Sequence, residues 1–561
     1  MKEKIIIYQI FTRLFGNDNT TRKENGSLAD NGCGKLNAFT PAVLRRIKKL
    51  GATHIWYTGV IRHATTTDYS ECGIPRQHPA VVKGNAGSPY AITDYYDIDP
   101  DLATDTAKRM KEFEALVKRT HAEGLKMVID FVPNHVARQY KSVCKPEGVA
   151  DFGERDDRNK QFDQQNNFYY CPGMPFDADI DLYHGEEQPY EEFPAKATGN
   201  DCFGNRPDRS DWYETVKLNY GVDYCDAGGM STHFSPTPDT WHKMLDILLF
   251  WAAKGVDAFR CDMAEMVPSA FWQWVTAEVR KKYKNVTFIG EVYNPARYRE
   301  YISAGFDWLY DKVGMYDCLR DVVGYRRPAS DITWQWQATD DIAGHMLYFL
   351  ENHDEQRLAS DFFAGNAQKG VPALIVSALM RSNPFMLYAG QEFGERGMDE
   401  EGFSGCDGRT TIFDYWSLDS LIHGYKTRRL LTKEEKETEA LYTKILNIAK
   451  TEDAIVKGEF FDLMYANPSS ENFDASRLFT FLRCYNKDLI VVLANFSDEE
   501  RNCKINIPQH AFDFLTVDKG IMQATDLMNG SSFSVCLTDE SPLKLTVGPW
   551  SGRIIKIGKR Q

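Results

Sequence analysis

Three acidic residues, Asp262, Glu291 and Asp354, each follow a short apolar run of the chain. Such a run indicates a buried strand of a parallel sheet. The carboxyl ends of parallel strands in a barrel meet on one face, and catalytic side chains gather there. Several carboxylates in one pocket are what the cleavage of a glycosidic bond requires. Their order along the chain therefore predicts one catalytic cluster at the mouth of a barrel.

Arg260 stands two residues before Asp262, so both side chains lie on the same face of a strand. A neighbouring arginine is expected to keep the pKa of Asp262 low, which suits a nucleophile. Glu291 ends the apolar run VTFIGEV, and partly apolar surroundings suit a general acid that later activates water. Asp354 is then the third carboxylate, which holds the sugar ring and favours its distortion.

Four further residues accompany this cluster. His135 and His353 can donate hydrogen bonds to sugar hydroxyls, and Tyr90 offers an aromatic face to a sugar ring. Asp130, taken alone, is more often a structural ion-pair partner, just as a single aspartate after a strand is more often a helix N-cap. The ordered set at successive strand ends argues against coincidence, because this barrel face carries catalysis.

Eight apolar runs alternate with amphipathic segments, and this alternation predicts a (β/α)8 barrel. The expected strands are Ile5–Phe11, His54–Tyr57, Lys126–Val132, Val256–Arg260, Val286–Val292, Phe306–Tyr310, Met346–Leu350 and Pro384–Tyr388. The clearest helices are Pro41–Leu50, Lys108–Glu123, Trp241–Lys254 and Ala270–Lys284. Glycines follow several of these helices, as is usual where a helix stops.

Two segments depart from the barrel pattern. Residues 136–236 lose periodicity to polar and turn-forming residues, and a structureless loop of that length is implausible in a compact domain. We expect an inserted subdomain B there, with the catalytic barrel formed by residues 1–135 and 237–453. Short alternating strands in residues 454–561, such as Arg477–Tyr485 and Asp488–Phe496, predict a carboxyl-terminal antiparallel β-sandwich.

Composition limits the partners. The 561 residues carry a formal charge of −14, which argues against nucleic acid as a partner, because phosphate backbones need a basic stripe. No apolar run approaches the roughly 18 residues that cross a bilayer, so no membrane partner is expected. The first apolar run is too short for a signal peptide, which predicts a cytoplasmic protein. The twelve scattered cysteines are expected to be reduced core thiols.

Four stretches in this order resemble the signature regions of the α-amylase family, glycoside hydrolase family 13. They read DFVPNH (130–135), FRCD (259–262), GEV (290–292) and ENHD (351–354). YQIFTRLF, SPYAITDYYDIDP and NPFMLYAGQEFGE also resemble family segments. The stretch VKLN (216–219) is similar to a fifth region in the neopullulanase-like branch. The resemblance covers nearly the whole chain.

The resemblance assigns a role to each residue of the cluster. It implies that Asp262 is the nucleophile, Glu291 the general acid/base and Asp354 the transition-state stabiliser of a retaining mechanism through a covalent glycosyl-enzyme. The other roles that it implies are orientation of the nucleophile by Arg260, sugar binding by His135 and His353, stacking by Tyr90, and support of the site by Asp130.

The resemblance also raises the question of calcium. Asn134 matches an asparagine that binds calcium in the family, and a structural hydrogen bond is an equally good reading of it. Many α-amylases have Lys-His where this chain has Glu265-Met266, and that histidine contributes its backbone oxygen to the metal. Because Met266 also has a backbone oxygen, this replacement alone does not abolish calcium binding. We expect no required cofactor, with calcium possible and Asn134 as the only motif-matched ligand.

Three functions remain open from the sequence. The first is a retaining hydrolase that cleaves α-1,4 bonds of starch, glycogen or maltodextrins. The second is a maltosyl- or glucanotransferase that uses the same site, because only the acceptor differs. The third is a non-catalytic carbohydrate-binding relative, which the retention of all three carboxylates disfavours. Endo or exo action, tolerance of α-1,6 branches and oligomeric state are not decided by the sequence.

Overall fold

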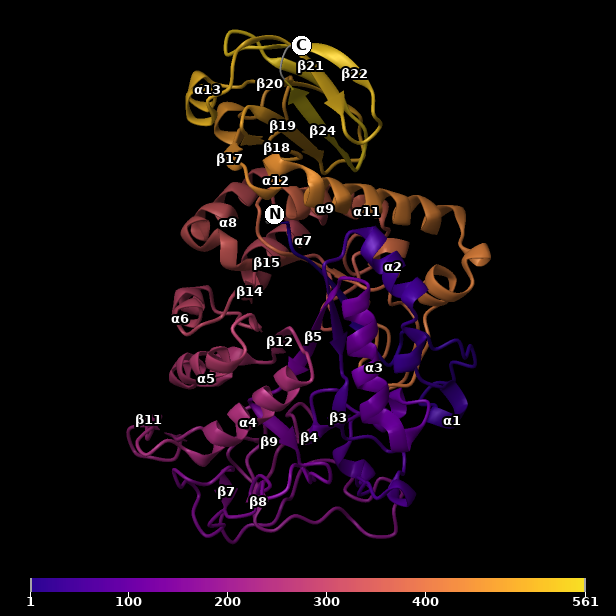
Figure 1. Cartoon of the computed structure of the whole chain (residues 1–561), viewed down its shortest axis with the longest axis vertical. Coiled ribbons are helices and arrows are strands. Elements are labelled where there is room, and N and C mark those ends of the chain that lie inside the picture. Colours follow the sequence, from indigo (N-terminus) through magenta and orange to yellow (C-terminus); the bar gives the residue numbers. More distant parts are fainter. Residues whose placement is uncertain (1–2, 559–561) are drawn as a thin grey trace.

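Eight parallel strands form a closed barrel in the computed structural model, which describes residues 3–558 (Figure 1). Every predicted barrel strand is present, with its ends within about two residues of the expected positions. The strands are β1 (Ile6–Phe11), β2 (His54–Thr58), β5 (Lys126–Phe131), β12 (Ala258–Cys261), β13 (Thr287–Gly290), β14 (Trp308–Tyr310), β15 (Met346–Phe349) and β16 (Phe385–Tyr388). The predicted (β/α)8 fold is confirmed.

The register of the barrel sets the height of the acidic residues. Arg260 on β12 pairs with Asp130 on β5 and with Ile289 on β13. The residues two positions further, Asp262 and Glu291, therefore leave neighbouring strands at the same level. Parallel pairing thus brings together residues that are far apart in the sequence.

Helices surround the barrel, whereas α12 and α13 pack against the carboxyl-terminal sheet (Figure 1). The four helices that the sequence predicts are α2 to α5. The helix α2 begins after Thr40, whose side chain accepts a hydrogen bond from the Val43 N–H, and ends at Gly51 with a φ of 128°. The helices are α1 (Leu28–Asn31), α2 (Pro41–Leu50), α3 (Arg109–Ala122), α4 (Asp239–Ala253), α5 (Ser269–Lys282), α6 (Tyr298–Ser303), α7 (Asp317–Val323), α8 (Ile332–Ala338), α9 (Val371–Leu379), α10 (Asp419–Leu421), α11 (Lys433–Thr451), α12 (Asp453–Val456) and α13 (Gln509–Leu515).

The inserted segment follows β5 and lies at one end of the molecule, opposite the carboxyl-terminal domain (Figure 1). It consists of long loops held by short antiparallel pairs. These strands are β6 (His135–Ala137), β7 (Tyr170–Cys171), β8 (Ala195–Lys196), β9 (Thr215–Lys217), β10 (Val222–Asp223) and β11 (Ser231–Thr232). A further pair, β3 (Ile61–His63) with β4 (Ile92–Ile98), follows β2. Because the insert follows the carboxyl end of β5, it lies beside the predicted cluster.

The carboxyl-terminal domain contains a six-stranded antiparallel sheet and a two-stranded sheet. Its strands are β17 (Glu459–Asp462), β18 (Leu478–Tyr485), β19 (Asp488–Asn495), β20 (Arg501–Ile505), β21 (Gly520–Asp526), β22 (Ser532–Leu537), β23 (Leu543–Val547) and β24 (Ser551–Gly558). Five of these strands were predicted. The strands β17, β21 and β22 were missed. The strand β17 has only four residues, and exposed and half-buried side chains mix along β21 and β22, so the apolar alternation is weak.

The helix α9 is buried along its whole length and packs against β19 and β24. It therefore joins the barrel to the carboxyl-terminal sheet. Arg483 on β18 reinforces this junction, because its guanidinium donates hydrogen bonds to four backbone carbonyls, one of them that of Met380 just after α9 (2.9 Å). The side chain is only 2% exposed.

The cysteines differ in part from expectation. All twelve are free thiols, but only six are buried. Cys72, Cys144, Cys225 and Cys536 are exposed, so the prediction that the thiols lie in the core is wrong for these. Cys72 lies in a short 3-10 helix, Cys144 and Cys225 lie on loops, and Cys536 lies on β22. Among the described residues, no helix has the length and apolar character needed to cross a bilayer.

Candidate active site

Arg260 lies at the centre of the predicted cluster and is fully buried. Its Nη1 donates to Asp262 Oδ1 at 2.7 Å, and its Nη2 lies 2.9 Å from Glu291 Oε2. Asp354 is more distant, with 4.0 Å between its Oδ2 and Nη2 of Arg260. Tyr310 accepts the remaining Nε–H at 3.2 Å. One guanidinium therefore orients the two carboxylates at the ends of β12 and β13.

Glu291 is held on both oxygens. The backbone N–H of Met263 donates to Oε2 at 2.7 Å, and the Tyr293 hydroxyl donates to Oε1 at 2.6 Å. Met263 follows Asp262 directly and has a φ of 43°, a left-handed conformation that is uncommon outside glycine. Strained backbone of this kind is found at functional sites, where the surroundings enforce it. Here the strained residue is the one whose N–H contacts the predicted acid.

Asp354 is positioned through His353. The His353 Nε2 lies 3.0 Å from Asp354 Oδ2 and also hydrogen-bonds the Tyr90 hydroxyl. Burial lowers the pKa of His353 well below its usual range, so the ring is neutral. Because the Gln9 amide donates to Nδ1 (2.8 Å), the single ring proton lies on Nε2, where the Tyr90 hydroxyl oxygen accepts it, and Asp354 lies beside this hydrogen bond.

Asp130 and His135 take different positions. Asp130 lies beneath the cluster, where its Oδ2 accepts the Gly59 N–H (2.9 Å) and its Oδ1 is 3.9 Å from Arg260. His135 lies on β6 and faces the cavity described below. Burial lowers the pKa of His135 to about 3, so this ring is also neutral. The structure thus brings all eight predicted residues together. Asp130, Arg260 and His353 contact the cluster without lining the cavity.

The expected low pKa of Asp262 is wrong. Burial raises its pKa well above the usual range, Glu291 and Asp354 add to this, and Arg260 only opposes it. Burial likewise raises the pKa of Asp354 to about 7, with Glu291 as the next cause. Sequence reasoning counted the nearby arginine but not three carboxylates around one cation. Groups packed in this way share protons, and acid catalysis needs such a proton.

A cavity of about 360 Å³ opens above these residues. Tyr90, His135, Asp262, Glu291 and Asp354 line it. Such a volume is at the size expected for a small organic ligand. It holds convergent polar groups and the perturbed carboxyls, which together mark an active site.

Several lining residues were missed by the sequence analysis. Tyr293 follows Glu291 by two residues, so a shared face of extended chain could have revealed it. Lys83 and Glu214 form an ion pair of 3.1 Å at the wall, and Trp212 and Phe413 supply aromatic surface. These four lie on irregular loops, where no periodic pattern marks a side chain as inward-facing.

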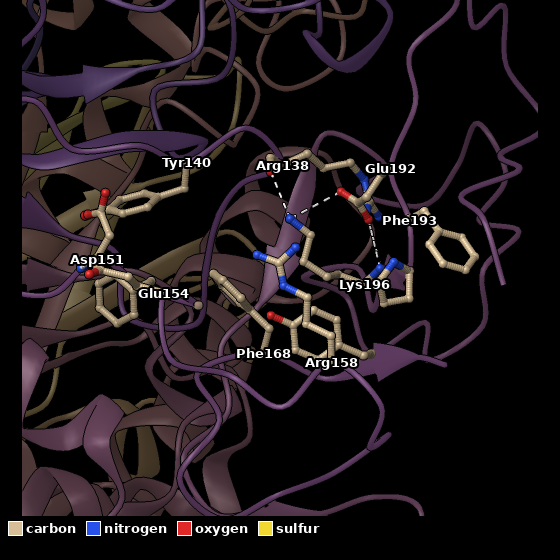
Figure 2. Close-up of a pocket in the computed structure, with 13 residues that line it drawn as sticks. Arg138, Tyr140, Asp151, Glu154, Arg158, Phe168, Glu192, Phe193 and Lys196 are labelled. Atoms are coloured by element: carbon tan, nitrogen blue, oxygen red, sulfur yellow. Dashed lines mark hydrogen bonds and ion pairs between the residues drawn. The ribbon is translucent and has the colours of Figure 1, made fainter. Parts of the chain in front are cut away.

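A second cavity, of about 210 Å³, lies within subdomain B (Figure 2). There the Lys196 ammonium lies 3.3 Å from Glu192 Oε2 and donates to the Arg138 carbonyl at 3.1 Å. Its polar groups largely satisfy one another, and none of the strand-end carboxylates lines it. The catalytic candidate is therefore the first cavity.

Two groups of residues have side chains of the kind that bind metal ions. Asp94, Asp97 and Cys144 are the only such cluster within the described part of the chain, but Arg62 and Arg109 already pair with the aspartates. Two arginines beside two carboxylates leave no charge for a cation. Asn134, the predicted calcium ligand, accepts a hydrogen bond from the buried Lys217 ammonium instead, as discussed below.

The barrel, the inserted subdomain and the strand-end carboxylates define a glycosidase-type fold and site. The model of the α-amylase catalytic domain matches residues 9–455, which is most of the chain. The protein therefore belongs to the α-amylase family.

Relatives agree with this membership. The chain is 26% identical over 407 residues to the α-amylase MalA of Haloarcula japonica, an alignment that covers 71% of this chain and 45% of MalA. It is 20% identical over 596 residues to neopullulanase 2 of Thermoactinomyces vulgaris, covering 99% of this chain and 78% of that protein. The chain thus spans less than half the length of MalA.

A solved structure shows the same fold over the whole chain. The maltogenic α-amylase AmyB of Thermotoga neapolitana superposes with a TM-score of 0.63 at 19% identity, and 99% of each chain is covered. At that identity the similarity is one of fold.

Proposed function

We propose that this protein is a retaining α-glucan hydrolase that cleaves α-1,4-glucosidic bonds of starch, glycogen or maltodextrins. The observation that carries the proposal is the single Arg260 guanidinium that contacts both Asp262 and Glu291. Two carboxyls held by one guanidinium favour the separation of about 5–5.5 Å used by retaining enzymes over the roughly 6.5–9.5 Å of inverting ones.

In this mechanism Asp262 attacks the anomeric carbon while Glu291 protonates the leaving oxygen. The covalent glycosyl-enzyme is then hydrolysed by water, which Glu291 deprotonates. The Arg260 and Met263 donors keep the two carboxylates aimed during both steps. Asp354 and His353 hold the sugar ring, and Tyr90 lies beneath it as a stacking surface.

The test is a time course on maltoheptaose, with products resolved by chain length. We expect only shorter products, with new reducing ends rising in step. Products longer than the substrate, with few new reducing ends, would show that the protein is a transferase instead of a hydrolase. A cyclomaltodextrin glucanotransferase is among the relatives, so this alternative has a precedent. No turnover at all would leave carbohydrate binding without catalysis.

Asp262→Asn tests the assigned nucleophile. We expect kcat to fall by at least about 10³-fold, because a catalytic nucleophile has no substitute. The melting temperature should be unchanged or higher, since a buried carboxyl of raised pKa is removed from a crowded site. Retained turnover, measured as reducing ends from maltoheptaose, would remove Asp262 from this role.

We further propose a cytoplasmic location, where imported maltodextrins or stored glycogen are the available substrates. Twelve cysteines that are all free thiols suit a reducing compartment. Fractionation of the source cells with an antibody to the protein tests this, and recovery outside the cells would refute it.

A further inference from the structure

The ammonium group of Lys217 is enclosed among oxygen atoms beside the active site. Its Nζ donates to Asn134 Oδ1 at 2.5 Å and lies 2.6 Å from Asp201 Oδ1 and 3.4 Å from the Met266 carbonyl oxygen. The lysine side chain is only 3% exposed. Three N–H donors thus face three oxygens, which is the full donor capacity of an ammonium.

These oxygens come from three separate parts of the chain. Asn134 lies in the turn between β5 and β6, and Asp201 lies in a loop of subdomain B. Met266 ends the short helical turn that begins two residues after Asp262. Lys217 itself ends β9 and pairs with His135 of β6, which faces the cavity. The ammonium therefore ties the inserted subdomain to the segment that carries the predicted nucleophile.

A calcium ion does not fit this set. Calcium takes six to eight oxygen ligands at about 2.3–2.6 Å, so the ion would have to lie at the centre of the oxygen cluster. Here the Lys217 ammonium already contacts the Asn134 amide oxygen and the Asp201 carboxylate at 2.5 and 2.6 Å. A divalent cation would have to displace a like charge that is covalently attached and buried. The one residue that matched a calcium ligand in the sequence is thus engaged by the protein's own cation.

We propose that Lys217 is a positioning residue that supplies, from the chain itself, the cation that joins subdomain B to the nucleophile segment, so that the active-site geometry is independent of divalent metal. The proposal deepens the proposed function, because the geometry that it fixes is that of the hydrolase site. It concerns no contact between Lys217 and substrate.

The first experiment measures the melting temperature and activity of the full-length protein after exhaustive treatment with a chelator, and again after calcium is added. We expect both to stay unchanged. A fall of several degrees on chelation that calcium reverses would overturn the proposal.

The second experiment compares Lys217→Met with Lys196→Met. Both lysines lie in subdomain B and both pair with a carboxylate, but Lys196 is half-buried and contacts residues of the insert (Figure 2), whereas Lys217 is buried and also reaches Asn134 and Met266. We expect each variant to melt about 5 °C lower, since a buried ion pair is broken. Only Lys217→Met should lower kcat/KM, by about tenfold or more, measured well below both melting transitions, because small misplacements of catalytic groups are costly. Equal kcat/KM for the two variants would reduce Lys217 to a purely structural residue.

Asp201→Asn keeps the test decisive if Lys217→Met does not fold. Asp201 is partly exposed, so its neutral isostere should fold and still lower kcat/KM by a few-fold. An unchanged kcat/KM would count against the proposal. The melting curves need no substrate, so they judge the metal independence even if no α-glucan is turned over. Failure of the proposed function is therefore distinguishable from failure of this one.

Discussion

At the level of single residues, the orientation of Glu291 depends on the groups that donate hydrogen bonds to it. Tyr293 donates its hydroxyl to the Glu291 oxygen that Arg260 and Met263 leave free. Tyr293→Phe keeps the ring in the cavity wall and removes only this hydrogen bond. We expect kcat/KM to fall about tenfold for maltooligosaccharides, because the acid loses its orientation. Aryl glycosides with good leaving groups need little acid help and should fall less. Equal losses on both substrate classes would show that the hydroxyl does not act through Glu291.

The burial of Asp130 predicts a pH dependence. Burial raises its pKa to about 6, against an ordinary value of 3.8, even though Arg260 opposes the shift. The folded protein therefore binds a proton more tightly than the unfolded chain, so stability falls as pH rises from about 4 to 6 and is level above that range. Asp130→Asn removes this loss and should be more stable than the wild type at pH 8 by about 2–3 kcal/mol.

Near pH 4 the Asp130 carboxyl is protonated in the folded state, so the difference between variant and wild type should be small there. Melting temperatures across this pH range give the answer. An equal gain in stability of Asp130→Asn at pH 4 and at pH 8 would show that the gain comes from packing and not from the raised pKa.

At the level of secondary-structure elements, β18 carries a buried arginine that pairs with no carboxylate of residues 3–558. Arg483 donates to the carbonyls of Ala454, Ile455, Gly458 and Met380. Burial lowers its pKa to about 9. Arg483→Met would leave these four acceptors unsatisfied at the junction of α9, α12 and the carboxyl-terminal sheet. We expect the free energy of unfolding to fall by about 3 kcal/mol. Calorimetry would show this as an unfolding transition at lower temperature.

The matched control is Lys457→Met, close to the same junction. Lys457 pairs with Asp453 at 2.7 Å, but the pair is partly exposed. Its loss should cost less than about 1 kcal/mol. An equal effect of both substitutions would show that the carbonyl contacts of Arg483 contribute little.

The elements also show what sequence patterns can predict. Asp262, Glu291 and Asp354 were predicted because each follows a buried strand, and the carboxyl ends of barrel strands have a fixed place in space. Trp212 and Phe413 line the same cavity but lie on loops, where position depends on tertiary contacts alone. The pKa of Asp262 is raised where the sequence predicted a low value. Burial and the neighbouring carboxylates cause this shift, and both exist only in the folded chain.

At the level of the whole molecule, regular structure is unevenly distributed. The barrel and the carboxyl-terminal sheet are continuous, whereas the region between β7 and β8 has no helix or strand and is largely exposed. Tyr183 lies there with 52% of its surface accessible. We expect brief chymotrypsin treatment to cut first after Tyr183, because proteases cut exposed irregular chain.

Mass spectrometry of the first fragments tests this order of cutting, and Tyr183→Ser should delay it. Trp334 provides the contrast, since it is 69% exposed but lies within α8. A first cut after Trp334 would mean that exposure, rather than irregular backbone, governs the cleavage of this protein.

The enclosed ammonium of Lys217 also determines how the protein obtains the cation at this junction. A bound ion exchanges with its surroundings, and its occupancy follows the free concentration by mass action. A lysine is part of the chain, so every molecule carries one such cation, and dilution, competing ions or chelators cannot remove it. The junction beside the active site is therefore complete as soon as the insert has folded, whatever the ionic composition around it.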